Sequence, residues 1–300
     1  MSLGLGVDLG GTTARAAVVD RESGRIVASS RKTWTDRGVE AVVKETSALV
    51  NELARAHPQA TGGLGVGFAG MLRGPVVVNA PNLGWREVDF GTPLSAAVGR
   101  PVKLVNDLSV AAWGEFMAGA ARGARDTLTV FVGTGVGSAI IVQGALVEGA
   151  SQVAAEFGHV KLMVSGGRRC GCGQDGCLEA YMGGAKLAEW MKEEGLTGTA
   201  SDLEPLARSG DATAKRLYDF AVSHLALAIA NQVTVLNPGV LVLGGGVLSR
   251  CPGMVARIRE LVAARATRSP SSSAPAWAAR SSCRARSSRA RARWPPSSAT

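Results

Sequence analysis

Three cysteines and a histidine in the middle of the chain have the types and spacing of metal ligands. Cys170, Cys172 and Cys177 lie within eight residues in the run CGCGQDGC, and His159 precedes the first of them by eleven residues. Thiolates with one imidazole are the donors of a structural Cys₃His zinc site. The spacing differs from a standard zinc finger, and five cysteines imply no disulfide framework. We therefore predict that these four residues bind Zn²⁺; reduced surface thiols are the alternative.

A glycine-rich turn near the start, DLGGTTAR, has the features of a phosphate site. The acid Asp8 comes at the end of a strand-like segment, and Gly10, Gly11, Thr12 and Thr13 follow it. Glycines let the backbone approach a phosphate, to which amides and threonine hydroxyls donate hydrogen bonds. A carboxylate at this place can hold Mg²⁺ through water. These residues alone leave an ordinary β-hairpin turn equally open.

Two further glycine clusters follow strand-like segments. The first, in GTGVGS, comprises Gly133, Thr134, Gly135 and Gly137. Strand-like residues 139–142 follow it, which excludes a Rossmann dinucleotide motif, because that motif must open a helix; the Walker A lysine is absent too. The second cluster, after VLVL, comprises Gly244, Gly245 and Gly246. Because glycines have no side chains to obstruct a ligand, this cluster could pack against an adenine or a ribose.

The elements that must position these turns follow a repeated pattern. We expect strands at 3–7, 14–20, 25–33, 64–68, 102–105, 127–132, 138–142 and 240–243. We expect helices at 38–56, 108–121, 178–194, 211–236 and 254–264, and a loop over 70–85. A strand, a glycine turn and a strand occur in both halves of the chain. This repeat predicts two related halves around a central cleft, with a single decorated nucleotide-binding sheet as the alternative.

The formal net charge of +9 is concentrated near the C-terminus. No acid follows Glu260, and residues 265–300 hold eight arginines, ten serines and nine alanines. Without those arginines, residues 1–264 carry 25 basic and 24 acidic residues, a formal charge of +1. The tail is open to three interpretations: a nucleic-acid-binding arm, a solvated disordered tail, or translation of a shifted reading frame. Its abrupt start inside an expected helix favours the third, so we expect no nucleic-acid partner.

Length and hydropathy narrow the class of protein further. A chain of 300 residues with 46% hydrophobic and 19% charged residues can bury a core, and its charge is too low for general disorder. The apolar runs are short, and no signal peptide precedes the first strand-like segment. We therefore expect a cytoplasmic protein without a membrane partner.

Taken in order, the motifs resemble the ROK family (repressors, open reading frames and kinases). They are DxGGT at Asp8–Thr12, the pair Asn106-Asp107, GTGVG at 133–137, Glu156 with His159, CxCGxxGCxE at Cys170–Glu179, and the late glycines 244–246. The resemblance covers about residues 3–262. NAPNLGW at 79–85 and EFGHVKL at 156–162 are most similar to the bacterial glucokinases of the family.

The resemblance implies an α/β, actin-like (ribonuclease H-like) fold with two lobes around a nucleotide and sugar cleft. We expect an N-terminal lobe over 1–106, a larger lobe with the zinc insertion over 107–264, and the atypical tail over 265–300. The glycine turns would hold ATP with Mg²⁺. Family members normally continue past the late glycines with a helix, a strand and a final helix, and we expect the closing elements after residue 264 to be replaced here.

The family match also assigns roles to individual residues. Asp107 would act as general base on a sugar hydroxyl, typically the 6-hydroxyl, as it attacks the γ-phosphate. Taken alone, Asp107 could equally be a helix N-cap. The implied sugar ligands are Gly70, Asn82, Asn106, Asp107, Glu156, His159 and Glu179. Glu156 and His159 lie three residues apart, so one helical turn could present both to one ligand. His159 would then face zinc with one ring nitrogen and the sugar with the other.

Several functions stay open at this point. The resemblance favours an ATP-dependent kinase that converts glucose to glucose 6-phosphate, acting as a dimer or tetramer. Mannose, fructose, N-acetylglucosamine or N-acetylmannosamine could replace glucose, and polyphosphate could replace ATP. A non-catalytic sugar-binding protein is a further alternative. A ROK repressor is disfavoured, because such proteins carry a DNA-binding segment ahead of the first turn, which begins here at Asp8.

Overall fold

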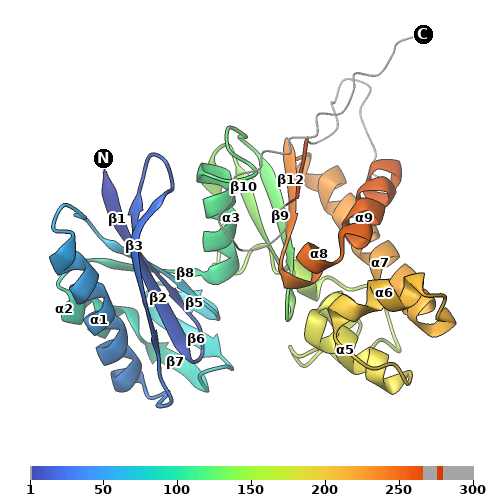
Figure 1. The fold of residues 1–300 in the computed structure, drawn as a ribbon, viewed down its shortest axis with the longest axis horizontal. Coiled ribbons are helices and arrows are strands. Elements are labelled where there is room, and N and C mark those ends of the chain that lie inside the picture. The colour runs from blue at the N-terminus through green and yellow to red at the C-terminus, as the bar shows by residue number, and fades with distance from the viewer. Residues whose placement is uncertain (1, 266–275, 280–300) are drawn as a thin grey trace, which may run out of the picture. The chain divides into compact units, whose positions relative to one another are not determined.

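A computed structural model describes residues 2–265 and 276–279 of the protein (Figure 1). The chain divides into two compact units. The first holds the chain up to Ala118 together with Glu148–Ala154; the second holds Gly119–Val147 and the described residues from Ala155 onward. Helix α3 (Asp107–Met117) therefore belongs to the first unit, although we expected that lobe to end at residue 106. It stays there because it packs on β4 and β8.

The first unit is built on a five-stranded sheet with the order β3-β2-β1-β4-β8. Its strands are β1 (Leu3–Leu9), β2 (Thr13–Asp20), β3 (Ile26–Thr33), β4 (Leu64–Phe68) and β8 (Val102–Asn106). The first three strands are antiparallel neighbours, and β4 and β8 add in parallel on the other side of β1. All five strands occur where the apolar runs predict them. The carboxyl ends of the parallel strands β1, β4 and β8 therefore lie at the same edge of the sheet.

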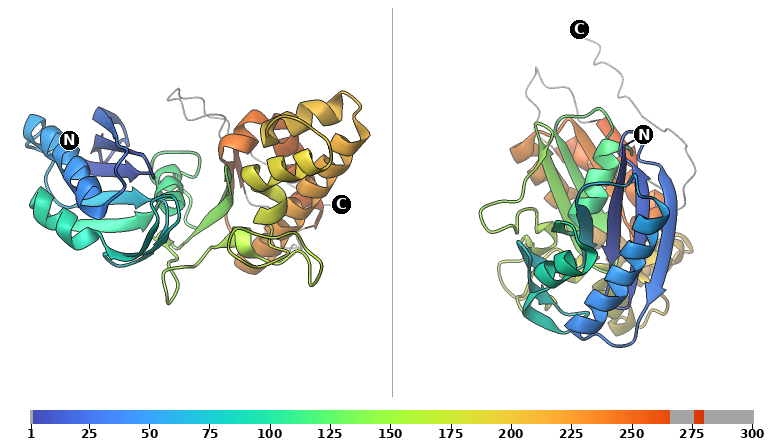
Figure 2. Two further views of the ribbon diagram at one scale, coloured as in Figure 1. Left: turned by 90° about the horizontal axis from the view of Figure 1, so that it is seen from below. Right: turned by 90° about the vertical axis from the view of Figure 1, so that its left-hand side faces the viewer.

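Helices α1 (Val39–Ala56) and α2 (Gly91–Val98) cover one face of this sheet (Figure 2). Val42, Leu49 and Leu53 recur at helical spacing along α1 and are buried, which is the amphipathic pattern that predicts the helix. Helix α2 ends at Gly99, whose φ of 64° is the left-handed conformation that glycine adopts without strain. Their apolar sides join the strands in a single core.

The expected loop over 70–85 is largely a small sheet, so that prediction was wrong. Its antiparallel strands are β5 (Met71–Arg73), β6 (Val76–Ala80) and β7 (Trp85–Asp89). Strands of three to five residues are too short to show a clear alternation, which is why the sequence pattern concealed them. Trp85 anchors this sheet to the core by packing on Phe68 and Phe90, with ring centroids 5.9 and 5.3 Å away.

The second unit repeats the same topology. Its sheet has the order β11-β10-β9-β12-β13, formed by β9 (Thr127–Val132), β10 (Val136–Val142), β11 (Ala145–Leu146), β12 (Val240–Gly244) and β13 (Ala276–Ala279). As in the first sheet, three antiparallel strands come first, and two strands then add in parallel. The prediction of two related halves is therefore confirmed, and both glycine turns join the first two strands of their half.

The helices of the second unit form one core with its sheet (Figure 1). They are α4 (Glu179–Met182), α5 (Gly184–Glu193), α6 (Leu203–Arg208), α7 (Ala212–Leu236), α8 (Gly246–Arg250) and α9 (Pro252–Arg265), with 3₁₀ turns η1 (Phe157–His159) and η2 (Ala200–Asp202). Helix α8 packs on β9 and β12, whereas α5 packs on η2 and α6 packs on η2 and α7. The helix expected over 178–194 is broken at Gly183, which is extended with ψ of 131°. This break separates α4 from α5 beside the second glycine turn.

Helix α7 is long and apolar enough to cross a membrane by length and composition alone, which the short apolar runs did not indicate. Ten of its residues are buried in the core of the second unit. A core helix of a globular protein has the same length and composition.

The sequence after residue 264 holds one element that we did not expect. Strand β13 pairs in parallel with β12, and Leu241 lies opposite Trp277. The order of strand, helix and strand therefore continues through α9, and the expectation that this closing strand is replaced was wrong. The rest of the Arg/Ser-rich tail, residues 266–275 and 280–300, lies outside the described residues, as do our interpretations of disorder or a shifted frame.

Candidate active site

The first glycine turn joins β1 to β2 and closes tightly. The Gly10 N–H donates a hydrogen bond to the Thr13 carbonyl at 2.9 Å. Asp8 lies opposite Arg15 in the antiparallel ladder, and their charged groups are 3.5 Å apart with both side chains exposed. The exposed Asp8 carboxylate fits a Mg²⁺ ligand, although Arg15 competes for it.

This turn also contacts one of the expected sugar ligands. A Cβ atom on Gly11 would come within 2.9 Å of the Asn82 Cβ and 3.0 Å of its carbonyl oxygen. Only glycine therefore permits the close approach of the turn to Asn82. The fold brings together two motifs that lie about seventy residues apart in the sequence.

Asn106 is held by hydrogen bonds on both sides of its side-chain amide. Its Oδ1 accepts from the N–H groups of Leu108 and Ser109 at 3.0 and 3.3 Å, which makes Asn106 the N-cap of α3. Its Nδ2 donates to the Gly70 carbonyl at 3.3 Å, with the amide orientation assigned from this network. One N–H of Nδ2 is then left for a ligand. Gly70 acts here through its carbonyl, which holds Asn106 in place.

Asp107 is the first residue of α3 and is half-buried. Its Oδ1 accepts from the Leu108 N–H at 2.9 Å, but the cap belongs to Asn106. Burial raises the pKa of Asp107 above the ordinary carboxyl value; the Leu108 hydrogen bond lowers it in part, and the negative charge of Asp8 raises it further. The N-cap interpretation of Asp107 is therefore wrong. A carboxyl with a raised pKa suits a base that accepts one proton.

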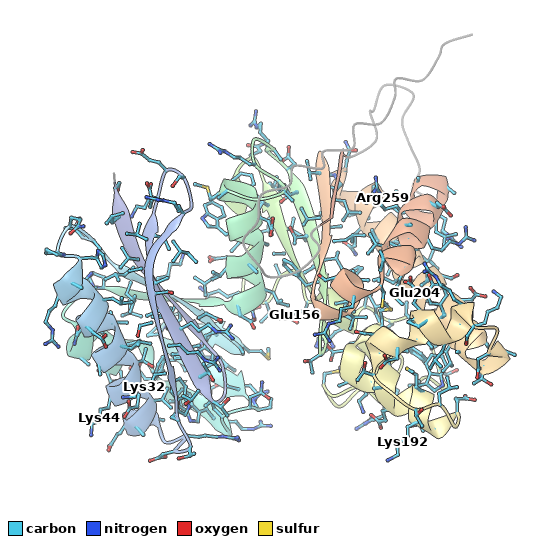
Figure 3. All side chains as sticks on the ribbon, in the orientation of Figure 1. Lys32, Lys44, Glu156, Lys192, Glu204 and Arg259 are labelled. Carbon is cyan, nitrogen blue, oxygen red and sulfur yellow. The ribbon has the colours of Figure 1, made fainter. Side chains whose placement is uncertain are left out.

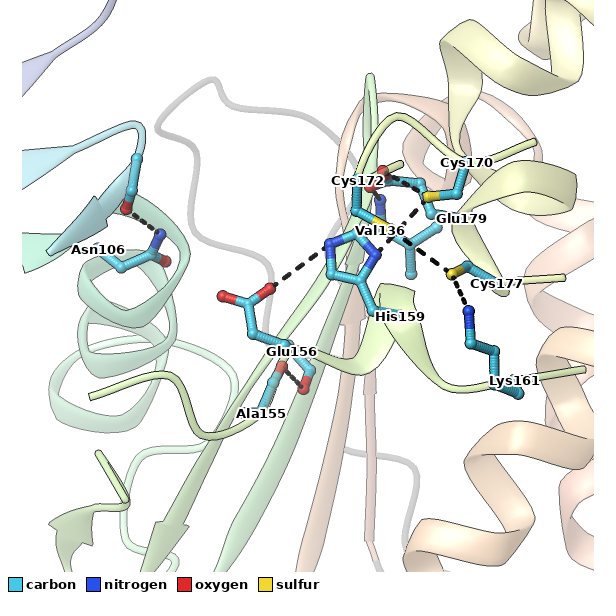
Figure 4. Close-up of polar contacts among 12 residues, drawn as sticks. Asn106, Val136, Ala155, Glu156, His159, Lys161, Cys170, Cys172, Cys177 and Glu179 are labelled. Atoms are coloured by element: carbon cyan, nitrogen blue, oxygen red, sulfur yellow. Dashed lines mark hydrogen bonds and ion pairs between the residues drawn. The ribbon is translucent and has the colours of Figure 1, made fainter. Parts of the chain in front are cut away.

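The second glycine turn, between β9 and β10, is held by Glu179. The Oε2 atom of Glu179 accepts from the Val136 N–H at 2.9 Å (Figure 4). The Gly133 N–H donates to the Gly135 carbonyl at 3.0 Å within the turn. Among the described residues, the N–H groups of Thr134 and Gly135 have no hydrogen-bond partner. These two amides are therefore the donors that the turn can offer to a phosphate.

The late glycines lie beside this turn, because β12 pairs with β9. A Cβ atom on Gly244 would come within 2.7 Å of the Phe131 ring, and one on Gly245 would collide with the Val132 backbone. Gly245 also has φ of 95°, which strongly favours glycine. Gly246 has open space around it. Two of the three glycines thus serve the packing of β12 on β9, and both clusters lie at the carboxyl ends of parallel strands, where ligands bind in α/β sheets.

Glu156 and His159 face each other across the single turn η1. The His159 Nε2 lies 3.9 Å from the Glu156 Oε2, while the Nδ1 on the other side of the ring lies 3.7 Å from the Cys170 Sγ (Figure 4). The two ring nitrogens therefore face different groups, one a carboxylate and the other the cysteine cluster.

His159, Cys170, Cys172 and Cys177 form one cluster, with all four donor atoms within 4.8 Å of one another. The sulfur atoms of Cys172 and Cys177 are 3.8 Å apart. A tetrahedral zinc ion with Zn–S bonds of about 2.3 Å places its sulfur ligands about 3.8 Å apart, so the residues present fit this ion. Nδ1 of His159 is the nitrogen that would reach it.

One positive charge, that of Lys161, borders this cluster, and burial acts on its thiols. The Lys161 Nζ donates to the Cys177 Sγ at 3.2 Å and to the Asp175 carbonyl at 2.8 Å. Burial raises the pKa of the Cys170 thiol to about 12. For Cys172, burial raises the pKa, but hydrogen bonds from Gln174, Cys170 and Cys177 and the charge of Lys161 outweigh it, so the pKa is lowered. Burial thus favours the neutral thiol at Cys170, and three neighbouring thiolates would be stable here only beside a bound cation.

The chain is similar to known proteins over most of its length. The model of the ROK family matches residues 4–288. The chain belongs to the ROK family. It is 35% identical over 266 residues to a glucokinase of Streptomyces coelicolor, a match that covers 82% of each chain. The family match runs past the expected end near residue 262 and includes β13.

Solved ROK structures share the fold. A ROK hexokinase from Thermus thermophilus superposes with a TM-score of 0.80 at 31% identity and covers 88% of both chains. A ROK glucokinase from Streptomyces griseus, in complex with glucose and AMPPNP, has a TM-score of 0.73 at 29% identity, covering 92% of this chain and 94% of that one. The expected α/β, actin-like fold is thereby confirmed.

Some residues that hold the site of this ROK chain together carry little signal in the sequence. Lys161 was not singled out, although a cation two residues from a predicted ligand was a usable signal. Gly158 and Gly183 were missed as well. A Cβ on Gly158 would collide with the Val136 carbonyl, and one on Gly183 would come within 2.9 Å of the Glu179 Cγ. Their only sequence signal is that each glycine lies close to a predicted site residue.

Proposed function

We propose that this ROK protein is an ATP-dependent hexose kinase that phosphorylates the 6-hydroxyl of glucose. The family membership and the similarity to glucokinases support the reaction class. The observation that carries the proposal is Asp107: a half-buried carboxyl with a raised pKa, at the start of a helix whose capping is done by its neighbour.

In the proposed reaction Asp107 accepts the proton of the sugar hydroxyl as that oxygen attacks the γ-phosphate. Phosphoryl transfer depends mainly on positioning and charge neutralisation, so the base must be held rigidly. Asn106 fixes the first turn of α3, and Gly70 fixes Asn106. The proton is then lost from Asp107 to solvent after transfer.

The glycine turns would hold the nucleotide. Thr134 and Gly135 offer two N–H groups to a phosphate, and the turn Asp8–Thr13 offers its own amides and hydroxyls. Mg²⁺, held through Asp8, would neutralise phosphate charge. We propose that ATP is the donor; inorganic polyphosphate is the alternative that a donor assay must separate.

The sugar hydroxyls would be bound by Asn82, Asn106, Asp107, Glu156, His159 and Glu179. We propose that zinc at the four-residue cluster orders this group through His159, whose Nδ1 would face the ion and whose Nε2 would face the ligand side with Glu156. The ion would serve structure, because all four donors come from the protein.

A coupled assay of ADP release across a sugar panel tests this function. Glucose should give the highest kcat/KM, ahead of mannose, fructose, N-acetylglucosamine and N-acetylmannosamine, with ATP preferred over polyphosphate. Another preferred sugar would overturn the glucose assignment but keep a hexose kinase. Sugar binding by calorimetry without turnover for any donor would show a non-catalytic sugar-binding protein. A cytoplasmic location, a homo-oligomer and the absence of nucleic-acid binding stay predictions.

A further inference from the structure

The two carboxylate oxygens of Glu179 contact two different parts of the second unit. Oε2 accepts a hydrogen bond from the Val136 N–H in the glycine turn at 2.9 Å. Oε1 lies 3.8 Å from the Cys170 Sγ of the metal cluster (Figure 4). One side chain therefore touches both the turn and the cluster.

Three glycines make room for this arrangement. A Cβ atom on Gly135 would collide with the Glu179 carboxylate, and one on Gly183 would come within 2.8 Å of the Glu179 carbonyl. A Cβ on Gly158 would collide with the Val136 carbonyl and lie 3.4 Å from the Glu179 Cβ. The turn, η1 and α4 are thus packed around Glu179 at backbone contact distance.

The segment after Cys177 holds the turn from a second side. The Gly184 N–H donates to the Gly133 carbonyl at 2.8 Å, and the Ala185 N–H donates to the Thr134 carbonyl at 3.0 Å. Residues 177–185 therefore contain one metal ligand and three hydrogen-bonding groups that fix the turn. These bonds fix the backbone of the turn and therefore the direction in which the free N–H groups of Thr134 and Gly135 point.

We propose that Glu179 is a positioning residue. Through it, a metal bound at the cluster of His159 and the three cysteines sets the shape of the second glycine turn, so that metal occupancy controls nucleotide affinity. This inference rests on the proposed function, because it takes the turn as the nucleotide site. An ion bound at the cluster fixes Cys177, whose carbonyl accepts from the Ala180 N–H at 3.1 Å at the start of α4. Glu179 lies in that same first turn and bonds to the glycine turn through Val136, so the ion anchors the backbone from which Glu179 reaches the turn. The role of the metal then extends beyond the sugar ligands.

A double cycle of metal removal and substitution tests the proposal. MgADP affinity is measured by calorimetry in the absence of sugar, for the zinc-loaded and chelator-treated protein, in wild type and Glu179→Ala. Zinc removal should weaken MgADP binding to the wild type by about tenfold, the size expected for losing one hydrogen bond to a charged group. Glu179→Ala should show a similar loss when loaded and little further loss on zinc removal.

Two variants and a second measurement sharpen the test. Glu179→Gln retains an acceptor for the Val136 N–H and should keep most of the affinity. Glu189→Ala on α5, which removes an exposed partner of Lys186, should bind as wild type. If Glu179→Ala fails to fold, hydrogen exchange in the wild type decides: peptides covering 133–142 should exchange faster after zinc removal, while peptides of the first unit stay unchanged.

The outcomes separate the two proposals. Unchanged MgADP affinity in folded Glu179→Ala, equal losses on zinc removal in wild type and variant, or unchanged exchange of 133–142 would overturn the coupling alone. A zinc-loaded wild type that does not bind MgADP would overturn the proposed function, and the inference with it.

Discussion

Asn106 caps helix α3 through its side-chain oxygen, and Asp107 begins the same helix without carrying the cap. The two adjacent polar residues therefore differ in what they bond: the amide oxygen accepts from the N–H groups of Leu108 and Ser109, and the carboxylate keeps free acceptor capacity. The sequence order ND places the neutral side chain at the cap and the titratable one on the first turn.

Replacing the base should stop turnover but spare binding. Asp107→Asn removes the proton acceptor while Asn106 still caps α3, so the helix should stay intact. General-base catalysis contributes about 10²–10⁴-fold, and we expect kcat to fall by that range or more. Glucose affinity, measured by calorimetry, should change little. A kcat near the wild-type value in this variant would rule out Asp107 as the base.

The pH dependence of the reaction should report the raised pKa of Asp107. Burial, with a smaller contribution from Asp8, favours the protonated acid, which cannot accept a proton. Activity should therefore fall as the pH drops through a midpoint that lies above 3.8, the ordinary pKa of an aspartate carboxyl. At pH values well above that midpoint, the enzyme should reach its full activity. The residual activity of Asp107→Asn should lack this acid limb in kcat/KM. The same limb in both proteins would assign it to another group.

Loss of one cysteine ligand should release the metal and weaken sugar binding. Cys172 is the exposed member of the cluster, so Cys172→Ser should disturb packing least. We expect elemental analysis to show little zinc in the purified variant and KM for glucose to rise, because His159 and Glu179 lose their anchor. Cys251→Ala is the control, since its sulfur contacts the Ser201 carbonyl instead. A zinc-free Cys172→Ser protein with an unchanged KM would contradict the proposed role of the metal.

Lys161 should strengthen zinc retention. Three thiolates around Zn²⁺ carry one net negative charge, and the ammonium of Lys161 lies 3.2 Å from the Cys177 Sγ. Lys161→Met keeps the chain length but removes the charge, and we expect zinc to bind about tenfold more weakly in competition with a chromophoric chelator. Lys192→Met on α5, a residue labelled in Figure 3, supplies the matched control. Equal zinc affinity of the two variants would show that Lys161 plays no part.

Glu204 should stabilise the second unit without any part in catalysis. Its buried carboxylate, labelled in Figure 3, accepts from the N–H groups of Gly253 and Met254 at 3.0 and 2.7 Å and so serves the N-terminus of α9. Glu204→Ala leaves these buried donors unsatisfied, at a cost of about 2 kcal/mol. Denaturant unfolding should show this loss, whereas Glu260→Ala, on the exposed side of α9, should change stability by less than about 0.5 kcal/mol.

The sequence alone predicted the candidate functional motifs and the two related halves of this protein. Local sequence is enough to predict these motifs, because the groups that would act together are neighbours in the chain. One motif has glycines, an acid and threonines within six residues, and the other has three cysteines within eight. The strand–turn–strand repeat is also local, since the period-2 pattern and the turn glycines lie in one stretch. These are the features that needed no tertiary information.

Only the tertiary structure decided how those motifs are held. That Glu179 bonds to Val136 and that Lys161 reaches Cys177 both depend on contacts between segments separated in the sequence. That Asn106 and not Asp107 caps α3 depends on the side-chain directions of two adjacent residues, either of which could cap a helix. The strands β5–β7 are too short for a periodic signal, and β13 is fixed by its backbone pairing with β12, which its alanine-rich composition does not reveal. Backbone hydrogen bonds between distant strands leave little trace in residue types, so folding alone determines which segments meet.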